Sequence, residues 1–283
     1  MKNIFTTLVT RFRLTILLLI LILSFDKTNA QWFWQNPLPQ GNTLQDVCYV
    51  NPNNGFAVGS AGTIIKTTDG GITWTILNSG TDYDLYSVSF TDLNNGTAVG
   101  NFGAILRTTD GGLSWVLQRG GLIEVFYGVS FTDLNNGTAV GADGLILRTT
   151  NGGNNWFNQT SGISTQLNDV YFTSASTGTA VGDGGIILRT TNGGSNWVPQ
   201  NSGNTNQLYG ITFTDENTGT IVGSFSTILR TTNGGTNWVN QTSPVLSDIH
   251  DVSFIGNTGI AVGPVGFIIK TTNGGTNWVS QTS

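Results

Sequence analysis

The chain has 283 residues, a formal net charge of −5 at pH 7, only 10% charged residues and 39 glycines. Beyond residue 30 it has seven lysines and arginines against fifteen acids. It therefore lacks the basic stripe that neutralises phosphates, which argues against nucleic acid as a partner. The single cysteine, Cys48, excludes an internal disulfide, and the single histidine, His250, excludes a metal site with two imidazoles.

The first thirty residues differ from the rest of the chain. Three basic residues precede an apolar run over residues 14–23, and small residues at 28–30 offer a cleavage site. We expect a secretory signal peptide over residues 1–30. An uncleaved anchor is the alternative, although a spanning helix needs about 20 apolar residues. The mature chain would begin at Gln31 and be secreted, periplasmic or on a bacterial cell surface, and would meet the membrane only through this segment before cleavage.

One motif recurs through the remainder of the chain with an almost constant period. It ends in tryptophans that stand 41, 41, 41, 41 and 40 residues apart: Trp74, Trp115, Trp156, Trp197, Trp238 and Trp278. A fixed period of this length indicates a repeat architecture. In the fifth copy, residues 208–213, 220–222 and 227–231 and a segment that opens at Trp238 are typical of strands separated by turns. Four short antiparallel strands per repeat predict one propeller blade each.

We therefore expect an all-β fold, a single propeller over residues 31–283 with six four-stranded antiparallel blades. The repeats fall at about 44–80, 81–121, 122–162, 163–203, 204–244 and 245–283. A seven-bladed or incomplete ring is the alternative, because residues 32–36 resemble the fourth strand at 197–201 and leave one strand more than six blades need. We expect this segment to lie against the terminal blade, with the open arc of a shortened chain as the other possibility.

Each tryptophan closes a segment that resembles the Asp box, Ser/Thr-x-Asp-x-Gly-x-Thr-Trp. Residues 67–74 and 108–115 match it with Asp69 and Asp110 at the acidic position. The later copies carry asparagine there: Asn151, Asn192, Asn233 and Asn273. We expect these side chains to accept hydrogen bonds from amides of their own turn while the tryptophan covers it. A calcium ion needs several converging oxygens and each turn offers about one carboxylate or none, so no metal or cofactor is expected.

Together with the preceding Gly-x-Ile-Leu-Arg-Thr-Thr run, these boxes make residues 44–283 similar to the photosystem II assembly and stability factors and their bacterial relatives, a BNR-type repeat family. The resemblance implies a propeller, typically of seven blades, that binds a client protein and is not an enzyme. We expect a secreted, non-catalytic scaffold for another protein or a surface glycan. The alternatives are a sialidase-like or other glycoside hydrolase, with Asp46, Asp169 and Asp251 as acids to test, and a surface lectin or adhesin.

Six cations share one repeat position near the end of the third strand: Lys66, Arg107, Arg148, Arg189, Arg230 and Lys270. Because they are spread around the ring, they do not converge as the arginines of a sialidase do. They either pair with a carboxylate or carbonyl at their own end of the blade, such as Arg107 with Asp92, or form a ring that docks an acidic partner.

In a repeat protein, departures between copies are better guides to function than sameness. The residues that enter the inner strands differ between copies: Gln45, Tyr86, Tyr127, Asn168, Tyr209 and His250. Phe102 and Phe225 stand at the tips between the second and third strands. Strand direction places all of these on the face opposite the Asp boxes. We expect a protein-binding or glycan-binding face there, with ordinary edge packing as the alternative.

Overall fold

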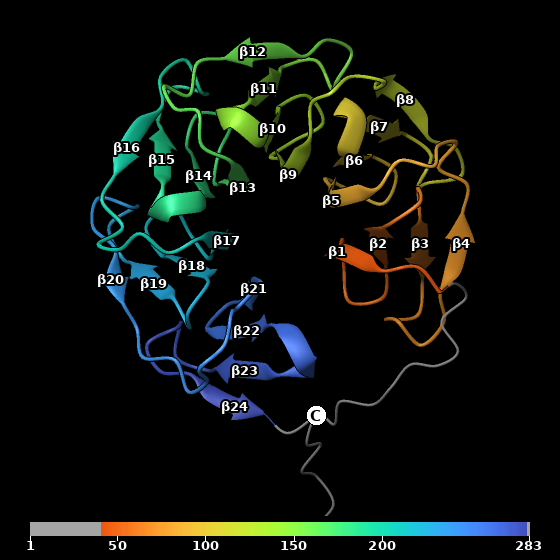
Figure 1. Ribbon diagram of the computed structural model, residues 1–283. Coiled ribbons are helices and arrows are strands. Elements are labelled where there is room, and N and C mark those ends of the chain that lie inside the picture. Colours follow the sequence, from red (N-terminus) through yellow and green to blue (C-terminus); the bar gives the residue numbers. More distant parts are fainter. Residues whose placement is uncertain (1–40, 282–283) are drawn as a thin grey trace, which may run out of the picture. The chain divides into compact units, whose positions relative to one another are not determined.

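The computed structural model describes residues 41–281, which form six sheets of four antiparallel strands arranged as the blades of a ring (Figure 1). The predicted all-β propeller with six blades is therefore confirmed. The expected signal peptide and the segment 32–36 lie outside the described residues. Among residues 41–281 there is no helix with the length and apolar character that a membrane crossing requires.

Within each blade the strands follow chain order from the centre of the ring outward (Figure 1). Blade 1 contains β1 (Leu44–Tyr49), β2 (Gly55–Gly59), β3 (Ile64–Thr67) and β4 (Thr75–Leu77), and blade 2 contains β5 (Leu85–Phe90), β6 (Gly96–Gly100), β7 (Ile105–Thr108) and β8 (Val116–Arg119). Blade 3 contains β9 (Phe126–Phe131), β10 (Gly137–Gly141), β11 (Ile146–Thr149) and β12 (Phe157–Gln159), and blade 4 contains β13 (Leu167–Phe172), β14 (Gly178–Gly182), β15 (Ile187–Thr190) and β16 (Val198–Gln200). Blade 5 contains β17 (Leu208–Phe213), β18 (Gly219–Gly223), β19 (Ile228–Thr231) and β20 (Val239–Asn240), and blade 6 contains β21 (Asp251–Ile255), β22 (Thr258–Val262), β23 (Ile268–Thr271) and β24 (Val279–Gln281).

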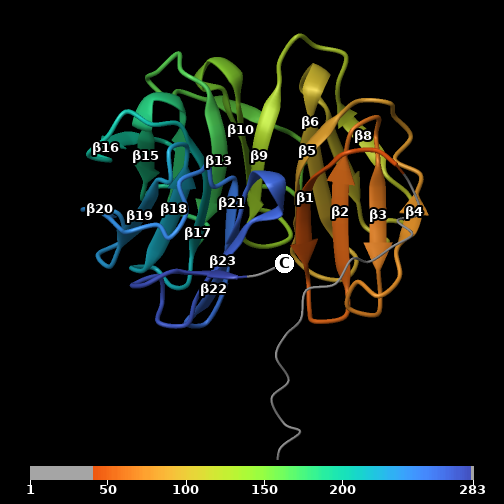
Figure 2. The ribbon, with the colours of Figure 1, turned by 60° about the horizontal axis from the view of Figure 1, so that its bottom comes forward.

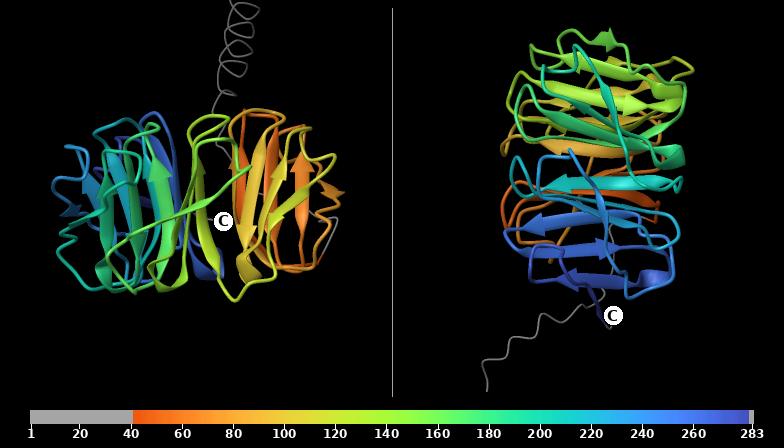
Figure 3. Two further views of the ribbon diagram at one scale, coloured as in Figure 1. Left: turned by 90° about the horizontal axis from the view of Figure 1, so that it is seen from above. Right: turned by 90° about the vertical axis from the view of Figure 1, so that its left-hand side faces the viewer.

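The strands predicted for the fifth copy agree with β17 to β20 to within one residue at each end. The strands run roughly along the ring axis, from one face of the ring to the other (Figures 2 and 3). Single 3-10 turns occupy four of the tips between second and third strands: η1 (Asn101–Gly103), η2 (Ala142–Gly144), η3 (Asp183–Gly185) and η4 (Pro264–Gly266). Sequence periodicity did not predict these turns, because three residues are too few to show a helical period.

The apolar core lies between neighbouring blades. Val140 and Ile146 of blade 3 pack against Leu167 and Val170 of blade 4, for example, and all four are almost completely buried. Each second strand of blades 1 to 5 is buried along its whole length, which requires cover on both faces of the sheet. A blade therefore depends on what packs against the faces of its sheet for its apolar core.

Close packing also explains the glycine at or next to the start of each second strand. At Gly137 an added Cβ would overlap the ring of Phe131 on the adjacent strand, and Gly96 stands in the same relation to Phe90. The ring in turn meets the tryptophan of its own blade edge to face, as Phe90 meets Trp115 with centroids 5.9 Å apart. The glycine thus makes room for the aromatic pair that fills the space between blades.

Blades 1 and 6 do not pack against each other as other neighbours do. Hydrophobic clusters join each of the five consecutive pairs of blades, and within residues 41–281 none joins blade 6 to blade 1. Val262 of blade 6 is 38% exposed, whereas its counterparts Val140 and Val222 are fully buried. In blade 1, Val47 is 50% exposed where Val88 of blade 2 is 5% exposed. The described arc therefore ends in two partly apolar sheet faces, and its closure by residues 32–36 stays a prediction.

This difference predicts unequal effects of one substitution at one repeat position. Val140→Ala removes two buried methyl groups and should lower the free energy of unfolding by about 2 kcal/mol. Val262→Ala should lower it by about 0.5 kcal/mol or less, because that side chain already meets solvent. Urea unfolding of both variants beside the unchanged protein gives the comparison. Equal losses would show that blade 6 is covered as the inner blades are.

The Asp boxes are closed turns held by one threonine and one acid or amide. In the first box, Thr67 Oγ1 donates to Asp69 Oδ1 (2.8 Å) and accepts from Gly71 N (2.8 Å). Asp69 Oδ1 accepts from Thr73 N (2.9 Å), and its second oxygen accepts from Thr73 Oγ1 (2.6 Å). These bonds lower the pKa of Asp69 to about 2, with the Thr73 hydroxyl as the largest cause. In the structure these side chains thus bond to groups of their own turn.

Where asparagine replaces the acid, the residue four places later changes with it. Asp69 and Asp110 face hydroxyls at Thr73 and Ser114, which donate to the second carboxylate oxygen. The other boxes pair asparagine with asparagine: Asn151 with Asn155, Asn192 with Asn196, Asn233 with Asn237 and Asn273 with Asn277. An amide nitrogen cannot accept from a hydroxyl, so the hydroxyl would lose its acceptor beside asparagine.

We therefore predict that Asp69→Asn lowers the thermal midpoint at pH 7. The folded-state pKa of Asp69 lies below its unfolded value, so the contribution of the carboxylate is present above about pH 4 and is lost as the pH falls toward 2. The difference between variant and parent should shrink over that range. The double variant Asp69→Asn with Thr73→Asn copies the later boxes and should recover most of the loss. A double variant no more stable than the single one would contradict this pairing.

Candidate functional site

The side chains that differ between repeats gather at one end of the central channel. A cavity of about 110 Å³, called the channel mouth below, is lined by Gln45, Asp46, Tyr86, Ser87, Tyr127, Asn168, Asp169, Tyr209, His250 and Asp251. On the same face, Gly62 at a blade tip donates to the carbonyl of Tyr83 in the next blade-to-blade connection (2.8 Å). On the opposite face, Gly111 of an Asp box donates to the Asn94 carbonyl (2.9 Å). The structure thus gives the molecule a mouth face and a box face, as strand direction predicted.

A β-bulge presents the outermost mouth residue in five blades. The pairing of the first and second strands skips one residue in each of blades 1 to 5, and the skipped residues are Gln45, Tyr86, Tyr127, Asn168 and Tyr209. A bulge leaves its extra residue outside the ladder and redirects the side chain. In blade 6, His250 occupies this position, and its amide donates to the Val262 carbonyl (2.8 Å). The bulge in blades 1 to 5 and the equivalent position of blade 6 therefore display six side chains of four kinds around the channel: three tyrosines, one glutamine, one asparagine and one histidine.

Aromatic rings form two pairs at the mouth. Tyr86 and Tyr127 are stacked with centroids 5.5 Å apart, and Tyr209 meets His250 edge to face at 5.4 Å. The Tyr209 hydroxyl donates to Gln207 Oε1 (2.7 Å). These rings combine apolar faces with polar edges, which suits them to contact a ligand as well as one another.

The next layer into the channel contains carboxylates that tie blades together. Asp46 Oδ2 accepts from Val88 N of blade 2 (2.8 Å), and Asp169 Oδ2 accepts from Ile211 N of blade 5 (2.8 Å). Asp251 accepts from Val252 N of its own strand (2.7 Å), and within residues 41–281 no hydrogen bond reaches its second oxygen. The cause is the break in the arc, since Asp251 has no following blade to bind.

These three carboxyl groups all have raised pKa values. Burial is the largest cause for Asp46 and for Asp169, whose pKa lies well above its usual range. Asp251 is open to the channel but crowded by protein on its other sides. This desolvation raises its pKa to about 7, and the charge of Asp46 adds to the effect. The ionised form of Asp251 is therefore disfavoured in the folded protein.

The pKa shift of Asp251 predicts a pH-dependent stability. Because its folded-state pKa is raised, the carboxyl group costs nothing below about pH 4 and destabilises the fold increasingly as the pH rises to 7. Asp251→Asn removes the charge and keeps an acceptor for Val252. The variant should unfold at the same urea concentration as the parent at pH 4 and gain about 1–2 kcal/mol at pH 8, allowing for the solvent in the channel.

Asp215→Asn on the box face is the matched control. Amides of Asn217 and Thr218 lower the pKa of Asp215, so the asparagine variant should be the less stable protein at pH 7, and its deficit should shrink as the pH falls below about 4. Parallel pH profiles for Asp251→Asn and its parent would contradict the raised pKa of Asp251.

The repeated cations lie between blades and bind backbone carbonyls. Arg148 is 7% exposed, donates from Nη2 to the carbonyl of Ala175 in blade 4 (2.7 Å) and lies over Phe172 at 5.0 Å. Three other cations also donate to a backbone carbonyl of the following blade. These pairs are Arg107 with Leu134, Arg230 with Gly274 and Lys66 with Gly111. Asp92 and Asp133 act on Arg107 and Arg148 only through their charge, and Arg189 donates to Thr179 of its own blade (3.5 Å). The structure therefore does not gather these arginines into one exposed patch.

Exposed side chains occupy the blade tips in a strained backbone conformation. Phe102 and Phe225 are 52% and 80% exposed and have φ values of 52° and 53°. Glycine stands at this position in blade 4 as Gly184, and the remaining tips carry Ala61, Asp143 and Val265 at positive φ. Residues other than glycine pay a steric cost in this region.

Sequence reasoning missed two acids that hold these tips. Asp84 Oδ1 accepts from Ala61 N (2.8 Å), and Asp248 Oδ1 accepts from Phe225 N (3.0 Å). Both acids stand at one repeat position, two residues before the residue that enters the inner strand, Tyr86 or His250. Their shared repeat position is the feature of the sequence from which the two acids could have been identified.

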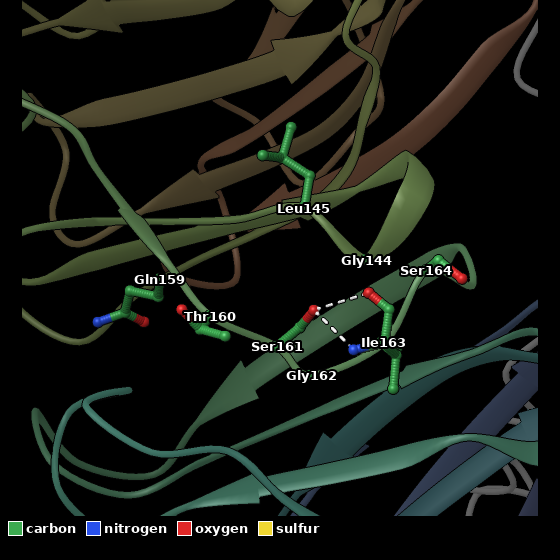
Figure 4. A pocket seen from close by; sticks show the side chains of 8 residues that line it. All are labelled: Gly144, Leu145, Gln159, Thr160, Ser161, Gly162, Ile163 and Ser164. Atoms are coloured by element: carbon green, nitrogen blue, oxygen red, sulfur yellow. Dashed lines mark hydrogen bonds between the residues drawn. The ribbon is translucent and has the colours of Figure 1, made fainter.

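A larger hollow of about 610 Å³ lies at the rim of blade 3, lined by residues 144–145 and 159–164 (Figure 4). Its best-defined contacts are those of Ser161 Oγ with the carbonyl and amide of Ile163 (Figure 4). None of its lining residues is titratable. In the part of the chain that the structure describes, no cluster of three or more His, Cys, Asp or Glu side chains is suited to a metal ion.

Comparisons with known proteins place this geometry in a family. The family model described as photosynthesis system II assembly factor YCF48 matches residues 26–122, 121–202 and 198–282. A photosystem II assembly lipoprotein, Ycf48 of a Nostoc species, is 37% identical over 76 residues, which cover 25% of this chain and 22% of that protein. The chain thus aligns with less than a quarter of that relative's length.

Solved structures share the fold over most of the chain. A YCF48 bound to a D1 peptide is 25% identical with a TM-score of 0.69, over 86% of this chain and 82% of that one. A GH74 enzyme of Niastella koreensis has a TM-score of 0.72 at 16% identity, over 88% of this chain and 47% of that one. The second likeness is one of fold alone.

Proposed function

Because the chain belongs to the family of the photosystem II assembly factor YCF48, we propose that it is a non-catalytic scaffold that binds an extended segment of another protein at the channel mouth. The observation that carries this proposal is the ring of six side chains, of four kinds, displayed on the bulges of blades 1 to 5 and at the equivalent position of blade 6. Repeats that are otherwise nearly uniform differ where these residues lie. A solved relative is bound to a peptide, which supports a polypeptide as the class of ligand.

The chemistry of the mouth supports binding more than catalysis. Both oxygens of Asp46 and of Asp169 accept backbone amides, which leaves neither carboxylate free to act as a base. Tyrosine and histidine rings beside amide side chains offer apolar contact and hydrogen bonds together, as protein-binding surfaces do. We propose that the repeated arginines and the Asp boxes hold the blades in place and do not contact the client.

We further propose that the protein acts outside the cytoplasm. The pattern over residues 1–30 is that of a secretory signal, and the similar Nostoc protein is a lipoprotein. Electrophoretic mobility of the protein purified from the envelope fraction, compared with that of the full-length chain, would test removal of this segment.

The strained tips extend the proposed binding surface. Phe225 is 80% exposed at a φ that glycine adopts without cost, so neither burial nor local backbone preference explains a phenylalanine there. Strain that persists at an exposed position is typical of functional sites. We propose that Phe102 and Phe225 contact the client beside the mouth.

The proposal predicts that a substitution at Phe225 weakens peptide binding without lowering the stability of the fold. Selection from a displayed library of random ten-residue peptides should yield peptides that bind the purified protein. Phe225→Gly relieves the positive φ and should leave the free energy of unfolding unchanged or raise it by about 1 kcal/mol. The same variant should weaken binding of the selected peptides by about tenfold, the loss of one aromatic contact at an interface.

Ala61→Gly is the matched control for this experiment. It relieves the same backbone strain at the tip of blade 1 without removing an aromatic ring, so peptide affinity should not change. Failure to select any peptide, or selected peptides that bind Phe225→Gly and a Tyr127→Ala variant as tightly as the parent, would reject the mouth face as the client site.

A further inference from the structure

The mouth face and the box face differ strongly in charge. Nine of the fifteen carboxyl groups in residues 41–281 belong to the mouth, the tips or the connections on the mouth face: Asp46, Asp82, Asp84, Glu124, Asp143, Asp169, Asp183, Asp248 and Asp251. Of the seven cations in the same part of the chain, only Arg119 lies on this face, and it forms an ion pair with Glu124 at 2.5 Å. The box face holds the other six cations and an equal number of acids. A ligand at the mouth therefore meets the negative charge of the acids at the tips and connections, and within residues 41–281 no unpaired lysine or arginine lies on this face.

The acids of the mouth face stand next to its aromatic rings. Asp183 and Asp248 both act electrostatically on the hydroxyl of Tyr209, and Asp84 acts on that of Tyr86. Asp183 is fixed in this place by Asn168, whose Nδ2 donates to its Oδ1 at 3.0 Å. Aromatic faces bordered by carboxylates are the arrangement that recognises ammonium and guanidinium groups.

A second observation points into the cavity itself. Asp46 and Asp169 use both carboxylate oxygens within the fold, whereas one oxygen of Asp251 has no partner in the described residues. Asp251 lines the same cavity as Tyr209 and His250. A crowded carboxyl group with one free oxygen provides an acceptor for a donor that enters the channel mouth.

We propose, building on the function proposed above, that the client segment bound at the mouth is basic, and that a lysine or arginine side chain enters the cavity over the tyrosine rings to bind Asp251. The rim acids Asp183 and Asp248 hold the neighbouring positive charges of the same segment. The opposite assignment, an acidic segment on the ring of arginines, is disfavoured because Arg107, Arg148 and Arg230 already bind carbonyls between blades.

Three fluorescein-labelled ten-residue peptides test this inference. Serine alternates with lysine in the first peptide, with glutamine in the second and with glutamate in the third. Fluorescence anisotropy measures their dissociation constants with the mature chain at low and at moderate salt. The lysine peptide should bind at least about ten times more tightly than the glutamine peptide, and salt should weaken it. Asp251→Asn should weaken the lysine peptide by about tenfold, and so should Asp183→Asn combined with Asp248→Asn.

Glu216→Gln is the matched control, because it removes one negative charge from the box face. It should leave the affinity for the lysine peptide unchanged. Asparagine keeps the acceptor oxygen at each substituted site, so the variants are expected to fold, and their unfolding midpoints confirm that before binding is measured.

The outcomes separate this inference from the proposed function. Equal weakening by Glu216→Gln and by the mouth variants would show general charge attraction and overturn the inference. Tighter binding of the glutamine or glutamate peptide, still lost in Phe225→Gly, would also overturn it while leaving a peptide-binding mouth intact. If none of the three peptides binds although library-selected peptides do, the basic ligand is rejected and the proposed function stands.

Discussion

Face-to-face packing of neighbouring blades is the contact on which the rest of this structure depends. A single blade of four short strands has no core of its own, and its second strand is buried only because another sheet lies on each side. The aromatic pair of each blade, such as Phe90 with Trp115, fills the space between sheets, and the glycine of the second strand makes room for it. The same requirement, repeated in every blade, keeps the repeats alike.

Function then has to use positions that packing does not determine. The bulge at the start of each inner strand in blades 1 to 5 removes one residue from the ladder, so its side chain is free to vary without loss of core contact. Tyr86 and Asn168 occupy the same backbone position and differ in chemistry for this reason. The break after blade 6 adds a further difference, because it leaves Asp251 without the cross-blade amide that Asp46 and Asp169 bind. The side chains at the mouth can therefore differ between blades because the packing of the blades does not determine them.

Turn chemistry and periodicity predicted the strands and boxes well, because each is decided by residues close together in the sequence. The contacts of the cations were harder to predict. Arg148 binds the carbonyl of Ala175, 27 residues later in the next blade, and no local pattern reveals such a partner. Bulges were missed because they are properties of strand pairing, and the same holds for the tip contacts of Asp84 and Asp248. The residues that line the mouth could be singled out from the sequence because they differ between aligned copies, and their role in binding stays a prediction.

The central claim is that a client polypeptide binds on the mouth face and leaves the box face free. Hydrogen–deuterium exchange of the protein with and without a library-selected peptide tests it most directly. Binding at the mouth predicts slower amide exchange over residues 85–88 and 250–252, while the box amides of Gly71, Gly112 and Gly153 exchange at unchanged rates. Protection confined to the boxes and to the turns beside them would contradict the account.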